Sequence, residues 1–337
     1  IWGSGAIGGT IGAYLARAGT DVLMVDTVAE HVEIMNRDGL LIEGPVDTFT
    51  TPIYATTPGK LSGRFERVLL CVKGQNTAAA VKMIKPHLAN DGYIVSIQNG
   101  LNETLIAKMI GGNRTIGAFI NFGADYQGPG HILFGARSTV VVGELNGKFT
   151  PRFQALLKKL NIFEPNAIAS DNVWSFLCCK LAYCSLLWAN AVVDGHLHEV
   201  FGSEIYRKML TELTREVVRI TEANGTKLEP FDPFDPLAFT QNAGQAAADH
   251  AFAKMYNHRL KSAKKHSGMW RDIAVRKRKT ELETLLLPVL QAGERHSLKM
   301  PLNSLLAKMV QEIEAGKRLQ TWQNFNELND RMASTAA

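Results

Sequence analysis

Long apolar runs are absent from this sequence. No apolar stretch in its 337 residues reaches the ~18–20 residues that a membrane-spanning helix requires, so we expect no membrane partner. The excess of basic over acidic residues is also small, because 37 Lys and Arg against 32 Asp and Glu leave a net charge of +5. That excess is too small to predict a nucleic-acid partner. The length predicts about two globular domains, each able to bury a core.

Cysteine is scarce as well. The four cysteines are Cys71, Cys178, Cys179 and Cys184. They show no metal-ligand spacing, and the last three fall in one apolar segment. Buried thiols in a reducing cytosol are favoured over disulfides. We therefore expect a cytoplasmic protein without a bound metal. The chain begins inside its first predicted strand without a methionine, so upstream residues are expected and a signal peptide stays open.

A glycine-rich segment opens the chain. Ile1–Trp2 is typical of the end of a strand, and Thr10–Ala18 continues as an apolar-periodic helix. Between them the pattern G-x-G-x-x-G comprises Gly3, Ser4, Gly5, Ala6, Ile7 and Gly8. In dinucleotide-binding proteins such glycines allow a tight turn, a close backbone approach to a pyrophosphate, and close helix–strand packing. The phosphates then lie at the helix N-terminus.

An acidic residue follows at the spacing that this motif requires. The strand Asp21–Val25 ends on Asp26, close to the ~20 residues expected between the glycines and a ribose-binding carboxylate. A carboxylate accepts hydrogen bonds from the ribose hydroxyls and repels a 2′-phosphate. Asp26 therefore favours NAD, with NADP as the alternative.

Strands alternate with helices over the next hundred residues. The strand Phe65–Lys73 ends on Lys73, and the strand Gly92–Gln98 ends at Asn99. This alternation predicts a parallel, doubly wound sheet whose ligands bind at the carboxyl ends of the strands. We expect Lys73 and Asn99 to bind there, although each could be only a polar residue leaving the sheet. Lys73 could instead meet the 2′-phosphate of NADP.

The pattern changes after residue 115. Short β segments separated by glycine-rich turns over 116–144 predict antiparallel strands that finish the same sheet. From Ser170 onward the pattern is helical, with an apolar helix over Val173–Ala191 and a long helix over Met269–Ala292. We expect an α/β Rossmann-type domain at 1–168 and an all-α substrate domain at 169–337, the architecture of dehydrogenases with an interdomain active site.

Lys180 is the only charged residue between Asp171 and Asp194. Burial of an ammonium group is costly. Lys180 is therefore either a lysine extending to solvent at a domain edge or a general acid whose pKa burial lowers toward ~7–8. Cys184 and Trp188 follow one and two turns later on the same helix face.

A second polar cluster lies in the helical half. Ser267 could be the N-cap of the helix beginning near Met269. Glu281 follows four consecutive cations and could be only their ion-pair partner. Most of that basic run is expected to be a solvated helix face.

Taken together, these segments resemble the ketopantoate reductase (2-dehydropantoate 2-reductase) family. The resemblance runs in order over most of the chain, through GSGAIGG, CVKGQN, SIQNGLN, the Lys180 helix, HSGMWRD and RKTELE. It implies an NAD(P)-dependent oxidoreductase in which Lys180 is the proton donor and Glu281 orients the substrate and Lys180. Ser267 and Asn99 would bind the polar end of a small acidic substrate, and a homodimer stays open.

Two positions depart from the family pattern. Members usually carry asparagines four and eight residues after the lysine, where this chain has Cys184 and Trp188. The resemblance implies that these side chains line the substrate pocket. Loss of two amide partners predicts a substrate other than ketopantoate, because hydrogen-bonding pockets discriminate strongly. A dehydrogenase of a 3-hydroxy acid or sugar acid, and a non-catalytic dinucleotide sensor, remain alternatives.

Overall fold

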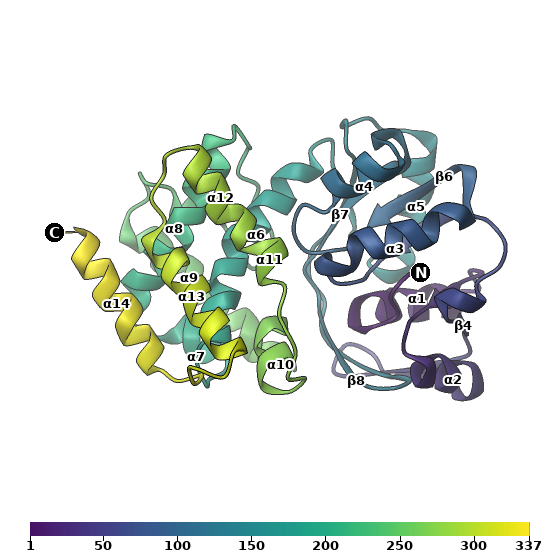
Figure 1. The fold of residues 1–337 in the computed structure, drawn as a ribbon, viewed down its shortest axis with the longest axis horizontal. Coiled ribbons are helices and arrows are strands. Elements are labelled where there is room, and N and C mark those ends of the chain that lie inside the picture. Colours follow the sequence, from purple (N-terminus) through teal and green to yellow (C-terminus); the bar gives the residue numbers. More distant parts are fainter. Residues whose placement is uncertain (337) are drawn as a thin grey trace. The chain divides into compact units, whose positions relative to one another are not determined.

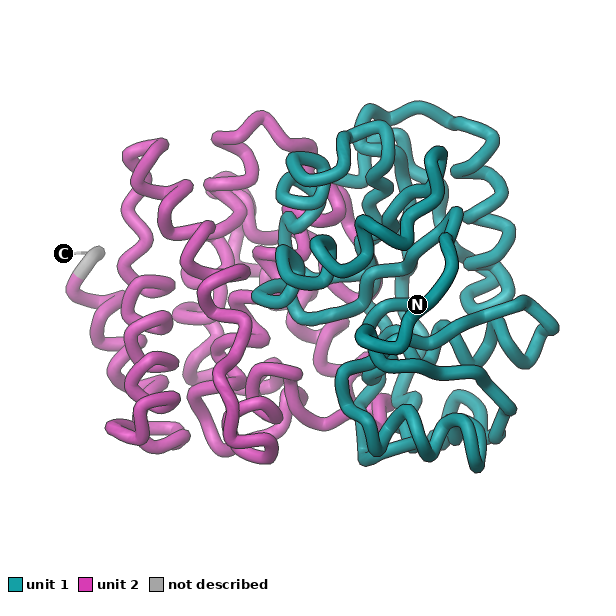
Figure 2. Tube along the Cα trace, turned by 45° about the vertical axis from the view of Figure 1, so that its right-hand side comes forward, with its two compact units in different colours: residues 1–174 teal, residues 175–337 magenta. Residues whose placement is uncertain are grey.

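A computed structural model describes residues 1–336. The chain divides into two compact units, Ile1–Trp174 and Ser175–Ala337, coloured teal and magenta in Figure 2. The boundary proposed from the sequence, near residue 168, falls in the short strand β11, a few residues before this division. Helix α6 begins in the first unit and continues into the second.

The first unit alternates strands and helices (Figure 1). Its elements are α1 (Ala6–Arg17), β1 (Leu23–Val25), α2 (Ala29–Asp38), β2 (Leu40–Glu43), β3 (Phe49–Thr51), β4 (Tyr54–Thr56), β5 (Phe65–Leu70), α3 (Thr77–Ile84), β6 (Leu88–Ser96), α4 (Glu103–Ile110), β7 (Thr115–Ile120), β8 (Gly123–Gly128), β9 (His131–Ala136), β10 (Val140–Glu144), α5 (Pro151–Phe163) and β11 (Ile168–Ala169).

The main sheet is built on parallel strands. Its order is β11-β10-β7-β6-β5, and β5, β6 and β7 run parallel to one another. Trp2 forms parallel bridges to Val25 and to Leu70, so the residue before the glycine loop joins β1 to β5. The expected Rossmann-type α/β fold with a parallel sheet is confirmed.

A second sheet was not expected from the sequence. Strands β7 and β10 complete the main sheet as an antiparallel pair, but β8 and β9 lie elsewhere, in a four-stranded sheet of order β3-β2-β9-β8. The prediction that all the strands of 116–144 finish one sheet was therefore wrong. Strand β9 pairs in parallel with β2, with Ile42 opposite Ile132, and local alternation cannot reveal a partner that distant in the chain.

The main sheet buries both of its faces. Val68 and Leu70 of β5 pack in one core cluster with α3 and α4, whereas Leu69 packs in another with α1 and α5. Successive strand residues point to opposite faces, so continuous apolar strands are required when helices cover both sides. This arrangement places the carboxyl ends of the strands at one edge, where the loops of the predicted cofactor site begin.

The second unit is helical (Figure 1). Its helices are α6 (Val173–Ala191), α7 (Leu197–Gly202), α8 (Arg207–Ala223), α9 (Gln245–Lys261), α10 (Gly268–Ala274), α11 (Leu282–Leu285), α12 (Leu287–Arg295), α13 (Pro301–Glu314) and α14 (Gln323–Ala336), with a 3₁₀ turn η5 (Pro236–Phe239). None of the described helices combines the length and the apolar character needed to cross a membrane.

The long helix predicted over Met269–Ala292 is wrong, because the chain leaves helical geometry between α10 and α11. Asp272 is buried and accepts hydrogen bonds from the guanidinium groups of Arg276 and Arg278. Lys277 has a positive φ of 49°, a conformation that a continuous right-handed helix excludes. Most of the basic run is exposed, as expected, but it forms a loop around a buried carboxylate and not a helix face.

Candidate active site

The three motif glycines lie in three different environments. Gly3 has a φ of +91°, and a Cβ atom there would lie 2.9 Å from Val72 Cγ1. A Cβ atom on Gly8 would lie 2.0 Å from the carbonyl oxygen of Gly3. A Cβ atom on Gly5 would meet nothing within 4 Å. Gly3 thus forms the turn, Gly8 allows close helix packing, and Gly5 leaves open space beside the backbone, as a pyrophosphate requires.

The start of α1 has the chemistry of an anion site. Gly5 is the N-cap residue and supplies no side-chain hydrogen bond, and the first turn contains no acidic residue. The first N–H groups of a helix have no intrahelical acceptor, and the helix dipole favours negative charge there. Ala6, Ile7 and Gly8 occupy this first turn, so a phosphate group fits their backbone.

Asp26 lies beside the same loop. Its Oδ2 accepts hydrogen bonds from the Ser4 backbone N–H at 2.8 Å and from the Ser4 hydroxyl at 3.1 Å. Its Oδ1 accepts from the backbone N–H of Val28 at 3.0 Å. The carboxylate is therefore oriented by the backbone, at the end of β1 where a ribose-binding acid is expected.

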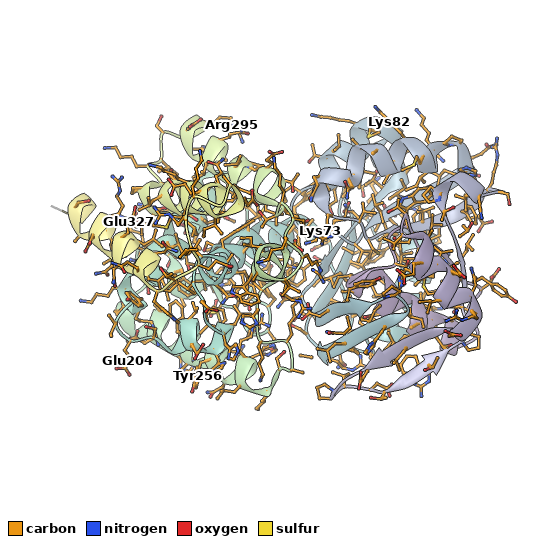
Figure 3. The ribbon with its side chains drawn as sticks, turned by 60° about the horizontal axis from the view of Figure 1, so that its bottom comes forward. Lys73, Lys82, Glu204, Tyr256, Arg295 and Glu327 are labelled. Carbon is orange, nitrogen blue, oxygen red and sulfur yellow. The ribbon has the colours of Figure 1, made fainter. Side chains whose placement is uncertain are left out.

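Lys73 and Asn99 follow the ends of neighbouring parallel strands, β5 and β6. Lys73 is the N-cap of a short 3₁₀ turn, η2 (Gly74–Asn76), and is labelled in Figure 3. Both side chains are partly exposed. The parallel register of the two strands brings these positions to one edge of the sheet, as the sequence predicted, and their roles toward a cofactor or substrate stay predictions.

The loops that carry these two residues are joined by a polar network. The Gln98 amide donates to Val72 O and to Thr77 Oγ1, each at 2.8 Å. Thr77 donates to Asn102 Oδ1 at 3.1 Å, and Asn102 donates to Asn99 O at 2.7 Å. Sequence reasoning missed Thr77, Gln98 and Asn102 as positioning residues, although Gln98 and Asn102 lie inside the SIQNGLN motif.

In the second unit, Lys180 is almost fully buried, at 7% exposure. Burial lowers the pKa of its ammonium to about 8, and the neighbouring Lys264 acts in the same direction. The Glu281 carboxylate opposes this shift by stabilising the charged form. A side chain with a pKa near neutrality can both release and take up a proton under physiological conditions.

Glu281 comes from the segment that sequence reasoning misassigned as helix. It is the N-cap residue of α11 and is 3% exposed. The preceding Thr280 donates its backbone N–H and its hydroxyl to Glu314 Oε1, at 2.8 and 2.5 Å. These hydrogen bonds attach the loop to α13. The Glu281 carboxylate raises the pKa of Lys180, which indicates that it lies near the ammonium.

Ser267 is the N-cap of α10, as its sequence context predicted, since its hydroxyl accepts from Trp270 N at 3.1 Å. Its own backbone N–H donates to Asn190 Oδ1 at 2.9 Å. Asn190 is fully buried and also donates to Gly195 O at 2.8 Å. This amide near the end of α6 positions the Ser267 loop, and sequence reasoning missed it.

Cys184 and Trp188 are both buried on α6. Burial raises the pKa of the Cys184 thiol to about 11, so it is a neutral group beside Lys180 and Glu281. Trp188 is 1% exposed. Its Nε1–H is buried and has no hydrogen-bond acceptor among the described residues. The structure thus brings Lys180, Cys184 and Glu281 together, and leaves a substrate role for Trp188 as a prediction.

Comparison with known proteins identifies the same pattern in both units. Residues 1–147 match the family model described as Ketopantoate reductase PanE/ApbA, and residues 178–314 match its C-terminal model. The 2-dehydropantoate 2-reductase of Pyrococcus abyssi is 27% identical over 327 residues, covering 94% of this chain and 97% of that protein. The enzyme of the same name from Streptococcus pyogenes serotype M18 is 23% identical, covering 95% and 99%.

Solved structures share the fold over nearly the whole chain. The structure of 2-dehydropantoate 2-reductase from Geobacter metallireducens aligns with a TM-score of 0.79 at 21% identity, covering 93% of this chain and 98% of that one. The ternary structure of D-mandelate dehydrogenase with NADH and anilino(oxo)acetate also has a TM-score of 0.79, at 18% identity, covering 94% and 97%. The chain has the fold of these enzymes and belongs to the ketopantoate reductase family of oxidoreductases.

Proposed function

We propose that this protein is an NAD(P)-dependent reductase of a 2-oxo acid, or the dehydrogenase of the corresponding 2-hydroxy acid. The observation that carries the proposal is a buried lysine, Lys180, with a pKa of about 8 and a carboxylate, Glu281, among its neighbours. A protonated amine with this pKa is suited to donate a proton to a ketone oxygen. Family membership supports the reaction class.

The glycine loop is the proposed cofactor site. The open space at Gly5 and the uncapped start of α1 fit a pyrophosphate, and Asp26 fits the ribose hydroxyls. The carboxylate beside Ser4 disfavours a 2′-phosphate, so we propose NAD in preference to NADP. When bound, the reduced nicotinamide supplies a hydride to the substrate carbonyl.

Lys180 and Glu281, both in the second unit, would carry out the proton transfer. In the reducing direction, the Lys180 ammonium gives one proton to the developing alkoxide and becomes neutral. In the oxidising direction, neutral Lys180 takes the hydroxyl proton. Glu281, close enough to affect the pKa of Lys180, would orient the ammonium and the substrate.

The substrate is proposed to be a small acid that differs from ketopantoate in bulk or polarity. Ser267 and the cations beside it would hold its carboxylate. Cys184 and Trp188 stand where the family usually has two asparagines, so the pocket would offer a neutral thiol and one indole N–H donor. D-Mandelate dehydrogenase, a neighbour in fold, acts on an aromatic 2-hydroxy acid by its name.

A turnover panel tests the proposal. Purified protein is assayed with 2-oxo acids in the reducing direction and with 2-hydroxy, 3-hydroxy and sugar acids in the oxidising direction, using NAD(H) and NADP(H). We expect activity on a 2-oxo or 2-hydroxy acid. Activity confined to 3-hydroxy or sugar acids would contradict the proposed 2-oxo or 2-hydroxy acid substrate and favour the alternative dehydrogenase. Nucleotide binding without turnover would favour a dinucleotide sensor.

The compartment is proposed from the thiols. None of the four cysteines forms a disulfide among the described residues, and Cys179 and Cys184 are buried. Buried thiols persist in reducing compartments, which supports a cytoplasmic location.

A further inference from the structure

His31 is a buried histidine to which neither the motif nor the proposed chemistry assigns a role. It lies on α2 and is 1% exposed. Its Nε2 lies 2.9 Å from the Ser4 carbonyl oxygen, in the glycine loop. Its Nδ1 accepts a hydrogen bond from the backbone N–H of Gly130 at 2.9 Å. The imidazole therefore spans from the glycine loop to the β8–β9 turn, using both ring nitrogens.

The two partners determine the protonation of the ring. A backbone N–H only donates and a carbonyl oxygen only accepts. Nδ1 must consequently be unprotonated toward Gly130, and Nε2 must carry the hydrogen that it donates to Ser4. His31 is thus a neutral imidazole of one defined tautomer. No other charge state of the ring satisfies both contacts.

Ser4 is held from two sides. Its N–H and hydroxyl both donate to Asp26, and its carbonyl oxygen accepts from His31. The residue is fully buried, so each of these groups depends on a protein partner. Because Ser4 stands between Gly3 and Gly5, its peptide groups determine how the phosphate-binding backbone is oriented.

The far side of the imidazole is equally well defined. Gly130 has a φ of +68°, and a Cβ atom on it would lie 2.4 Å from Ile34 Cγ2 of α2. Its carbonyl oxygen accepts from Leu41 N at 2.9 Å, at the start of β2. The ring of Tyr126, on β8, packs edge-on against the imidazole, with the two ring centroids 5.1 Å apart. His31 therefore links the glycine loop to a turn that the second sheet holds in place.

We infer that His31 is a positioning residue of the cofactor site, which holds the Ser4 carbonyl through its Nε2–H and anchors the glycine loop to the second sheet. The inference rests on the proposed function only in taking that loop to bind the dinucleotide. The positioning itself is a property of the protein without cofactor, and it can be measured separately.

Three substitutions separate the two contacts. His31→Phe keeps an aromatic ring and removes both hydrogen bonds. In His31→Gln the side-chain amide can still donate to Ser4 O, whereas in His31→Asn the side-chain oxygen can still accept from Gly130 N. The matched control is His131→Phe, because His131 belongs to the same β8–β9 hairpin but its imidazole hydrogen-bonds the exposed carboxylate of Glu43.

The first measurement is hydrogen exchange of the cofactor-free protein over the peptide containing residues 2–9. We expect His31→Phe and His31→Asn to increase exchange in this peptide, and His31→Gln and His131→Phe to leave it near that of the wild type. Unchanged exchange in His31→Phe would overturn the inference. So would a similar increase in peptides from both units, since the effect would then be general destabilisation.

The second measurement is NADH binding followed by fluorescence. We expect the dissociation constant to rise about ten-fold or more in His31→Phe, since a buried carbonyl loses its donor. His31→Gln should stay within about three-fold of the wild type. Equal affinities in His31→Phe and the wild type would overturn the inference. A wild type that binds neither NADH nor NADPH would overturn the proposed function instead, and loop exchange would still decide the role of His31.

Discussion

The Ser4 backbone N–H donates to Asp26 Oδ2 across 2.8 Å, so the acid at the end of β1 is hydrogen-bonded directly to the glycine loop. The Ser4 hydroxyl adds a second bond to the same oxygen, at 3.1 Å. These bonds fix the carboxylate beside the glycine loop, where we propose that the cofactor ribose binds. It would attract hydroxyl donors and repel a phosphate.

The first prediction follows for cofactor choice. Wild-type protein should bind NADH more tightly than NADPH, and Asp26→Ala or Asp26→Arg should narrow or invert that preference. Titration of both nucleotides against each protein measures the effect. If the wild type binds NADPH more tightly, Asp26 is not the deciding residue, and Lys73 becomes the candidate.

Removal of the proposed acid should impair the chemical step. Lys180→Ala should lower kcat by ~10²–10⁴, the usual contribution of a positioned general acid, with little change in nucleotide affinity because the glycine loop belongs to the first unit. Lys254→Ala, which removes an exposed lysine of the same unit, is the control and should have little effect. Near-normal kcat in Lys180→Ala would mean that the lysine is structural.

The pH dependence of kcat/KM should be opposite for reduction and for oxidation of the substrate. With a pKa of about 8, Lys180 is protonated below that pH. kcat/KM for reduction should be level below pH ~8 and fall about ten-fold per unit above it, whereas kcat/KM for oxidation should rise toward pH ~8 and then level off. A reduction rate that increases with pH through this range would contradict the assignment.

Glu103 gives a prediction about stability. It is fully buried at the start of α4, and burial raises the pKa of its carboxyl to about 7. The folded protein therefore binds a proton more tightly than the unfolded chain, and stability should fall as pH rises from about 4.5 to 7, by on the order of 3 kcal/mol. Glu103→Gln should reduce this loss.

Denaturant unfolding of both proteins at pH 4.5 and pH 8 measures the difference. The Gln variant should gain stability relative to the wild type mainly at pH 8. An equal difference at both pH values would show that the carboxyl does not change protonation on folding.

Substrate choice is the remaining prediction. The wild type should turn over ketopantoate slowly or not at all, and replacement of Cys184 and Trp188 together by Asn should shift preference back toward it. Cys178→Asn, on the same helix, is the control. A kcat/KM for ketopantoate of ~10⁴ M⁻¹s⁻¹ or more in the wild type would mean that both departures are tolerated.

The sequence by itself was sufficient to predict features that depend on residues close together in the chain. The turn at Gly3, the helix packing at Gly8 and the acid at the end of β1 follow from spacing, because one strand–turn–helix unit requires each of them. The apolar residues around Lys180 predicted that its helix is buried, but they left open whether the lysine itself extends to solvent. Ser267 was recognised as an N-cap, since capping is decided within one helical turn.

Only the tertiary structure decided the contacts between distant segments. His31 reaches Gly130, Asn190 reaches Ser267, and Thr280 reaches Glu314. No local periodicity encodes such pairs, because they depend on which strands and helices become neighbours in the fold. The same limit explains the wrong helix over Met269–Ala292: the local pattern favours a helix, but the buried carboxylate of Asp272 binds Arg276 and Arg278 and turns the chain. That turn brings Glu281 near Lys180.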